Sequence, residues 1–392
     1  MREFFVSCGL GLENDLKNEI KEVWHLLLNK KGESQIQPFP EFIKIEGGLE
    51  FSCEYEIGLQ LNYYLKIANR VLLRVAKFKA TSNADFEKHL NRISWGEYFK
   101  KASISVDVSS HSSKIYHKKR IEEFVMKHLK NKLSSEILTS SENSQVIYIR
   151  FENDFCQVSI DTSGEHLHKR GLSVLKGEAP LRETLASWVL RKCIEGIPLG
   201  SLQNIQLIDP MCGSATFLTE ALLLYSPNFS RKFAFQKFTN CPKILLTESY
   251  YKKCRDSNAI VFKKYFGFDI LQRIVEIAQK NWLESLKSLG LNSDIDATFE
   301  CVDVFNLKAE TFENKIQWVV VNPPYGERLK ITNTFNEMLL HFDKVFKPNK
   351  IAFLSPKFEL DTALSLRYPL QQRYPVLHGG LRLTLLILEK ES

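Results

Sequence analysis

Residues 205–224 of the chain have the sequence IQLIDPMCGSATFLTEALLL, in which a short apolar run ends at Asp209. A loop of small residues follows, and a helix-forming segment begins near Phe217. A strand that leads through such a loop into a helix N-terminus is typical of nucleotide-type sites at the carboxyl edge of a parallel sheet. Gly213 is the only glycine of the loop, which favours a ligand that carries a carboxylate over one that carries a pyrophosphate.

Two further acids end β-rich runs downstream of this loop. Asp269 closes the run FGFD at residues 266–269, and Asp303 closes the run ATFECVD at residues 297–303. In a nucleotide-binding fold, an acid at the tip of the second strand accepts hydrogen bonds from the ribose hydroxyls. We expect the third strand to bring Asp303 beside a bound adenine. One such acid alone is more often a helix cap or a turn residue, but three in succession favour a common ligand site.

Residues 318–326, WVVVNPPYG, contain the most specific motif of the chain. An apolar strand stops at Asn322, and two prolines then forbid both a helix and a strand ladder. The Asn322 side chain and Pro323 each present a carbonyl oxygen, and the ring of Tyr325 can stack on a base. Two acceptors beside an aromatic ring suit a planar base with an exocyclic amino group. The alternative interpretation is an ordinary turn after a strand.

The pattern of apolar residues changes once along the chain. Residues 1–170 alternate short β-rich and helical runs, which predicts an α+β region that includes a single strand over residues 42–51 and a hairpin turn at Asn153 and Asp154. From residue 180 onward, helices and strands alternate as in a parallel sheet. We therefore expect an α/β domain in the second half, with a domain boundary near residue 175 and a last strand over residues 381–389.

Composition excludes several classes of protein. The chain is 44% hydrophobic and 25% charged, as in ordinary soluble proteins. No apolar stretch reaches the length of a membrane span, and the N-terminus lacks a signal-peptide core, so we expect no membrane partner. The eight cysteines are scattered without a C-x-x-C pair. We therefore expect no disulfide framework, no metal site and a reducing, cytoplasmic location.

The net charge of +7 is mildly basic, and two runs concentrate it. Residues 114–132 hold seven basic residues against two acids, and residues 226–265 hold nine against two, with Phe and Tyr residues between them. Basic side chains interleaved with aromatics are suited to neutralising phosphates and stacking on unpaired bases. The alternatives are a solvated helix face for the first run and, for the second, an insertion folded on its own aromatics.

Three stretches resemble those of the THUMP-domain RNA guanine-N2 methyltransferases, and above all the bacterial 23S rRNA enzymes with an N-P-P-Y motif. They are residues 209–216 (DPMCGSAT), 322–328 (NPPYGER) and 179–186 (APLRETLA). The stretches at 68–75 and 160–171 resemble the body and end of the THUMP module. The resemblance implies a ferredoxin-like segment over residues 1–65, a THUMP RNA-binding domain over 66–172 and a Rossmann-like methyltransferase domain over 175–392.

The resemblance also implies a cofactor, a partner and a role for each site residue. The cofactor would be S-adenosylmethionine, with no metal, and the partner would be RNA, with rRNA favoured over tRNA. The implied cofactor-binding residues are Thr184, Asp209, Pro210, Cys212, Gly213, Ser214, Ala215, Thr216, Asp269, Asp303 and Asn322. The implied catalytic residues, which would position the target amine, are Asn322, Pro323 and Tyr325.

Three interpretations stay open from the sequence. The first is an RNA guanine-N2 methyltransferase that acts on rRNA or tRNA. The second is a methyltransferase for DNA adenine N6 or a protein amide, because an N-P-P-Y motif alone does not distinguish these amines. The third is a non-enzymatic RNA-binding protein with a degenerate cofactor loop. Ala215 suggests it, because the family usually has glycine there and a positive φ would strain an alanine.

Overall fold

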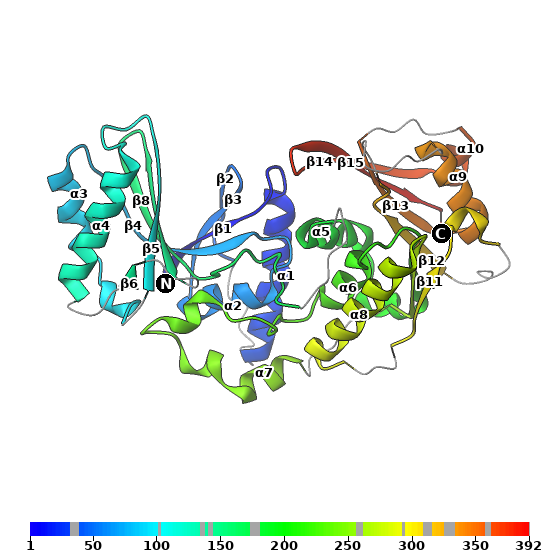
Figure 1. Cartoon of the computed structure of the whole chain (residues 1–392), viewed down its shortest axis with the longest axis horizontal. Helices are drawn as coiled ribbons and strands as arrows, with labels where there is room; N and C mark the ends of the chain where they lie inside the picture. The colour runs from blue at the N-terminus through cyan, green and yellow to red at the C-terminus, as the bar shows by residue number, and fades with distance from the viewer. Residues whose placement is uncertain are drawn as a thin grey trace. The chain divides into compact units, whose positions relative to one another are not determined.

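The computed structural model describes most of the chain (Figure 1). The described residues are 1–31, 39–100, 103–133, 138–139, 144–172, 181–255, 262–291, 295–308, 316–324, 334–356 and 362–391. They form two compact units. Unit 1 consists of Met1–Leu167 and Lys232–Tyr251, and unit 2 consists of His168–Arg231 and Lys252–Ser392. The chain therefore passes between the units three times, and the finer partition at residues 65 and 172 stays a prediction.

Unit 1 is built on one eight-stranded sheet in the order β2-β3-β1-β4-β8-β7-β5-β6. Its strands are β1 (Arg2–Ser7), β2 (Ile43–Ile45), β3 (Gly48–Cys53), β4 (Arg70–Lys79), β5 (Ser103–His111), β6 (Leu138–Thr139), β7 (Gln145–Glu152) and β8 (Phe155–Asp161). Its helices are α1 (Glu13–Lys31), α2 (Tyr55–Tyr64), α3 (Asn83–Leu90) and α4 (Lys118–Leu133). The sheet has alternating burial: in β7, Ile147, Ile149 and Phe151 are buried, and the residues between them are not.

The local turns of unit 1 follow from residue type, with one correction to the sequence prediction. Asn153 and Asp154 have φ of 50° and 66° between β7 and β8, which confirms the predicted hairpin, because short polar residues tolerate this conformation. The single strand predicted over residues 42–51 is wrong. Gly47, with φ of 77°, turns the chain there and divides the stretch into β2 and β3.

The segment 232–251 is inserted in the sequence of unit 2 but folds with unit 1. Phe233, Phe235 and Phe238 are buried, with at most 4% of each exposed. The rings of Phe233 and Phe235 lie edge-on to that of Tyr63, at 5.2 and 5.5 Å between centroids, and the Tyr63 hydroxyl donates to the Leu245 carbonyl at 3.1 Å. These phenylalanines are core residues of unit 1 and do not stack on bases, which decides between the two interpretations of the second basic run.

Unit 2 is built on a seven-stranded sheet in the order β11-β10-β9-β12-β13-β15-β14, parallel except for β15 and β14. The strands are β9 (Ile205–Asp209), β10 (Lys264–Asp269), β11 (Ala297–Cys301), β12 (Ile316–Val321), β13 (Lys350–Ser355), β14 (Leu370–His378) and β15 (Leu381–Glu389). The helices are α5 (Glu183–Ile194), α6 (Thr216–Leu223), α7 (Glu248–Arg255, which spans the boundary), α8 (Gln272–Leu289), α9 (Phe335–Phe346) and α10 (Thr362–Arg367).

Helices cover both faces of this sheet (Figure 1). On one face α5, α6 and α8 pack side by side. On the other, Met338 and Phe342 of α9 and Leu364 of α10 share a buried cluster with Val319 and Val321 of β12. Sandwiched strands need apolar side chains on both faces, which explains the unbroken apolar runs of β9 and β12. The α/β fold class predicted from the sequence is confirmed.

The strand order reverses between β9 and β12. From β9 the chain runs outward through β10 to β11, then returns to β12 on the other side of β9 and continues to β13. Such a reversal leaves a crevice at the carboxyl ends of the two central strands, where open α/β sheets bind their ligands. No described helix is long and apolar enough to span a membrane.

Candidate functional site

The predicted acids converge on the carboxyl edge of the sheet in unit 2. Asp209 is the last residue of β9 and lies opposite Gly267 of β10. Asp269 ends β10 two residues further on, opposite Cys301 of β11. Asp303 follows Cys301 by two residues. The three carboxylates therefore lie along one edge, each displaced outward from the one before it.

Asp209 is the most strongly perturbed of these acids. It is 2% exposed, and burial, together with the nearby charge of Asp269, raises its pKa to about 8. The amide N–H of Met211 donates to Oδ1 of Asp209 at 3.2 Å, which partly offsets the rise in pKa. Without a cation beside it, this carboxyl is largely protonated at neutral pH. A positively charged ligand group at the carboxyl would favour the ionised form.

The loop after Asp209 is held by the strand and the helix beside it. The amide of Cys212 donates to the Phe268 carbonyl at 2.8 Å, and the side-chain amide of Asn281 in α8 donates to the Ser214 carbonyl at 3.0 Å. Gly213 has φ of 53°, and a Cβ placed there would meet no atom within 4 Å. The loop therefore exposes an open backbone surface at Gly213, where a ligand can approach closely.

The other residues predicted for the loop are mostly covered. Pro210, Cys212 and Ser214 are buried, and Thr216, the first residue of α6, is partly exposed. Burial raises the pKa of the Cys212 thiol well above its usual value, so this cysteine is neutral. Thr184 is a buried residue in the first turn of α5.

Ala215 adopts the left-handed conformation, with φ of 65° and ψ of 32°, at the N-cap of α6. The expected strain at this departure from the family pattern is therefore present, and a non-glycine residue there costs about 1–2 kcal/mol. The residue is 0% exposed. Its methyl group consequently points into the protein interior and not into the open space at the loop, so it does not crowd a ligand there.

Asp269 and Asp303 are both partly exposed and use one oxygen each in local turns. Oδ1 of Asp269 accepts from the amide of Leu271 at 3.0 Å, and Oδ1 of Asp303 accepts from the amide of Phe305 at 3.0 Å. Within the described part of the chain, the second oxygen of each carboxylate has no hydrogen-bond partner. Both acids thus combine the capping role with a free acceptor that faces the edge.

Asn322 directly follows β12 and reaches the same edge from the other side of the crevice. Val319 pairs with Ile208 of β9, so Asn322 lies three residues, and Asp209 one residue, beyond this pair. Oδ1 of Asn322 is buried and has no hydrogen-bond partner among the described residues. A buried acceptor without a partner costs about 1–3 kcal/mol, which a ligand N–H would recover. Pro323 is also buried, whereas Tyr325 lies outside the described residues.

Sequence reasoning missed two groups of residues that position the site. Asn281, 1% exposed, anchors the loop through Ser214. Arg170 donates two hydrogen bonds to Glu220 in α6, at 3.0 and 2.8 Å, and the hydroxyl of Ser187 in α5 donates to the same carboxylate. All three residues of this cluster are buried. A single acid within the apolar helix sequence FLTEALL was the only signal for it.

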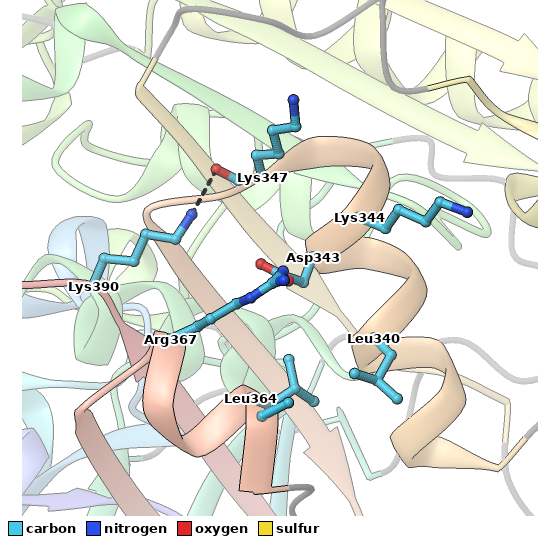
Figure 2. Close-up of a pocket in the computed structure, with 8 residues that line it drawn as sticks. Leu340, Asp343, Lys344, Lys347, Leu364, Arg367 and Lys390 are labelled. Atoms are coloured by element: carbon cyan, nitrogen blue, oxygen red, sulfur yellow. Dashed lines mark hydrogen bonds and ion pairs between the residues drawn. The ribbon is translucent and has the colours of Figure 1, made fainter.

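The cavity in Figure 2 is not part of this edge. It has a volume of 680 Å³ and is lined by residues of α9, α10 and the end of β15, among them Lys344, Lys347, Arg367 and Lys390. Lys347 lies between α9 and the start of β13, which places the cavity at the amino ends of the parallel strands. Its cations serve local contacts: Arg367 pairs with Asp343, and Nζ of Lys390 donates to the Lys347 carbonyl at 3.1 Å.

Comparison with known proteins assigns the family. A family model described as "RMKL-like, methyltransferase domain" matches residues 170–376, which are 207 of the 392 residues. The chain belongs to this methyltransferase family. The match covers the α/β part of the chain and contains the loop after β9, both acids downstream of it and Asn322.

Curated relatives of this RMKL-like methyltransferase are named ribosomal RNA large subunit methyltransferase K/L. The protein of Psychromonas ingrahamii is 26% identical over 386 residues, which cover 94% of this chain and 48% of that protein. The protein of Methylococcus capsulatus is 28% identical over 401 residues and covers 97% of this chain and 50% of that protein. The chain spans about half the length of the curated relatives that it matches.

Solved structures share the fold along the whole chain. A possible methylase from Clostridium difficile 630 is 24% identical, with a TM-score of 0.74 over 100% of this chain and 98% of that chain. The crystal structure of SMU.472, complexed with SAH, is 22% identical, with a TM-score of 0.75 over the same shares. At these identities the likeness shows the fold of the RMKL-like methyltransferase and does not extend to its substrate.

Proposed function

We propose that this protein is an S-adenosylmethionine-dependent methyltransferase for the exocyclic N2 amine of a guanine in RNA, with 23S rRNA as its substrate. The carrying observation is the buried, unpartnered Oδ1 of Asn322 at the crevice between β9 and β12. Three acids lie along the same edge. The curated relatives supply the rRNA substrate, since they are named for it. An rRNA substrate also places the protein in the cytoplasm.

The residues of the carboxyl edge fit S-adenosylmethionine. The open backbone at Gly213 and the buried carboxyl of Asp209 suit the methionine portion, whose ammonium group supplies the cation that Asp209 lacks. The free carboxylate oxygens of Asp269 and Asp303 are placed for the ribose hydroxyls and the adenine amine, in the order of the strands. Among the described residues, no group of three His, Cys, Asp or Glu side chains is arranged to hold a metal ion. The structure of SMU.472 with SAH has this fold.

The chemistry asks little of the protein beyond positioning. The bound sulfonium supplies the methyl group: the N–C bond forms as the C–S bond breaks, the electron pair stays on sulfur, and the amine then loses one proton to water. Asn322 Oδ1 and the Pro323 carbonyl accept hydrogen bonds from the target amine and aim its lone pair at the methyl carbon. Positioning and exclusion of water account for the rate acceleration.

The buried methyl of Ala215 argues against a decayed cofactor loop. Isothermal titration of the purified protein with S-adenosylmethionine tests this point directly. Measurable binding is expected, and its absence would favour a protein that binds RNA without modifying it.

Methyl transfer is tested with radiolabelled S-adenosylmethionine and rRNA or tRNA from a strain that lacks the gene, followed by mass-spectrometric mapping of the product. We expect N2-methylguanosine in 23S rRNA. Asn322→Ala should lower turnover at least about 100-fold, because an acceptor aimed at the reacting group contributes on the order of 3 kcal/mol. Asn131→Ala, at an exposed position of α4, is the matched control and should match wild type. Equal turnover of wild type and Asn322→Ala would reduce the Asn-Pro-Pro-Tyr segment to a turn.

A further inference from the structure

The sheet of unit 2 ends in a long two-stranded hairpin. Strands β14 and β15 pair over their whole length, from Leu370 opposite Glu389 to His378 opposite Leu381. Gly379 and Gly380 join them, with φ of 56° and 83°. A two-residue loop with positive φ at both positions matches the twist of the strands and holds the tip in one conformation.

The tip of this hairpin projects beyond the edge that carries the candidate site. β13 is parallel to β12, and its last residue, Ser355, pairs with Thr384 of β15. Residues 381–383 therefore have a strand partner only in β14. Three residues span about 10 Å, and the two strand spacings from β15 to β12 add about 10 Å sideways. The tip stands next to the crevice that Asn322 and Asp209 flank.

The hairpin carries positive charge without any acid. Residues 362–388 contain no Asp or Glu, whereas Arg367, Arg373, His378 and Arg382 lie within them. Arg373 and Arg382 are exposed, and neither forms an ion pair with any described residue. A surface with unpaired guanidinium groups beside a reaction edge is complementary to a polyanion.

Two exposed leucines accompany these cations at the tip. Leu377 is 49% exposed and pairs across the hairpin with Arg382, so the two side chains share one face. Leu381 is 53% exposed and shares the opposite face with His378. Apolar side chains between arginines suit contact with unstacked bases, as in proteins that insert such groups beside a base step.

The same tip lies close to the helix that contributes Thr184. Arg182 immediately precedes α5, and its charge, together with partial burial, lowers the pKa of His378. Electrostatic influence of this kind requires proximity. The exposed Arg182 therefore extends the cationic surface of the hairpin toward the start of α5.

We infer that the β14–β15 tip is the element of unit 2 that holds the RNA next to the target nucleotide. Arg373 and Arg382 contact backbone phosphates, and Leu377 and Leu381 lie against the neighbouring bases. This inference rests on the proposed function, because a base must be exposed before its amine can reach Asn322. The absence of acids and the position beside the crevice favour RNA over a protein partner at this surface.

The first test reverses the charge of the tip in the full-length protein. In the double variant Arg373→Glu/Arg382→Glu, we expect KM for rRNA to rise at least 10-fold and the slope of log Kd against log salt to fall by about 2, one unit for each lost phosphate contact. Affinity for S-adenosylmethionine should stay unchanged. The matched control is Lys280→Glu/Lys287→Glu on the exposed face of α8, which makes the same change in net charge.

Three outcomes of this test are distinguishable. A loss confined to the arginine variant supports the inference. Equal KM and salt slope in the two variants, with wild-type transfer to rRNA intact, would overturn the role of the hairpin and leave the proposed function standing. If wild type itself transfers no methyl group to RNA, the proposed function fails, whatever the variants do.

A second test measures where the tip touches the RNA. The photo-crosslinking residue p-benzoylphenylalanine replaces Leu381 in one variant and Leu283 of α8, which is 59% exposed, in the control. Irradiation of the complex with rRNA and S-adenosylhomocysteine should link position 381 within a few nucleotides of the methylated guanine, and position 283 not at all. Crosslinks from position 381 that are absent, or that lie far from this guanine, would refute the inference even if every variant folds.

Discussion

Replacing Asp209 by asparagine tests the electrostatics of the site without an assay of activity. Burial raises the pKa of Asp209 from 3.8 to about 8. Asparagine has nearly the same shape, keeps an oxygen that can accept from the Met211 amide, and carries no charge. The variant therefore removes the cost of burying the carboxylate and little else.

The direction of the effect follows from the shift. A carboxyl with a higher pKa in the folded state holds its proton more tightly there, so the free energy of unfolding falls as pH rises from the unfolded pKa to the folded one. At pH 7 the two pKa values of Asp209 correspond to about 4 kcal/mol, at about 1.36 kcal/mol per unit. Near pH 4 the difference vanishes, and above about pH 8 it is complete.

Urea unfolding of the cofactor-free protein between pH 4.5 and 8.5 measures this difference. We expect Asp209→Asn to match wild type at the acidic end and to become more stable by a few kcal/mol toward pH 8. Asp303→Asn changes a partly exposed carboxyl of the same edge and should give a smaller gain at every pH above 7. Parallel stability curves for wild type and Asp209→Asn would show that the carboxyl is not buried as described.

Further substitutions test the loop, the acids and the inserted segment. Asp269→Ala should weaken S-adenosylmethionine binding by about 1–3 kcal/mol in isothermal titration, as expected for a lost charged hydrogen-bond partner; unchanged affinity would remove Asp269 from the site. Ala215→Gly relieves about 1–2 kcal/mol of strain but loses a buried methyl and gains unfolded-state entropy, so unfolding free energy should change by less than about 1 kcal/mol; a loss above about 2 kcal/mol in urea unfolding would contradict this balance. Phe235→Ala should destabilise the protein by about 3–5 kcal/mol in the same assay with S-adenosylmethionine affinity intact, and a neutral effect would contradict its burial. A chain that begins at residue 168 should aggregate in sedimentation assays unless a Gly-Ser linker replaces residues 232–251, because Phe233 and Phe235 lose their packing partners; a soluble fragment with the native segment would refute this reasoning.

The motifs of the candidate site were readable because each is local. A strand that ends in an acid, a small-residue loop and a helix start occupy consecutive residues, and their chemistry follows from residue type alone. The parallel sheet then places the ends of successive strands at one edge, so the order Asp209, Asp269, Asp303 and Asn322 predicts a shared location. The structure puts all four there. Their roles toward a cofactor and a base stay predictions.

The second basic run shows where this reasoning stopped. Basic residues and aromatics alternate over residues 226–265 both in an RNA-binding surface and in a segment whose rings are buried. Composition does not separate the two, because burial of Phe233 and Phe235 depends on Tyr63, which lies about 170 residues earlier in the chain. The single strand expected over residues 42–51 failed for a related reason, since the turn at Gly47 interrupts a stretch that is otherwise rich in β-forming residues.

By itself, the sequence determined the fold class, the strand-loop-helix motif and the resemblance to a methyltransferase family, because these depend on residue order within short windows. Only the tertiary structure decided that Oδ1 of Asn322 has no partner, that the carboxyl of Asp209 is buried deeply enough to hold its proton, and that Ala215 is left-handed with its methyl enclosed. The same is true of the projection of the β14–β15 tip past β13. Burial, satisfaction of polar atoms and strand register arise from contacts between residues far apart in the chain, and no local pattern specifies them.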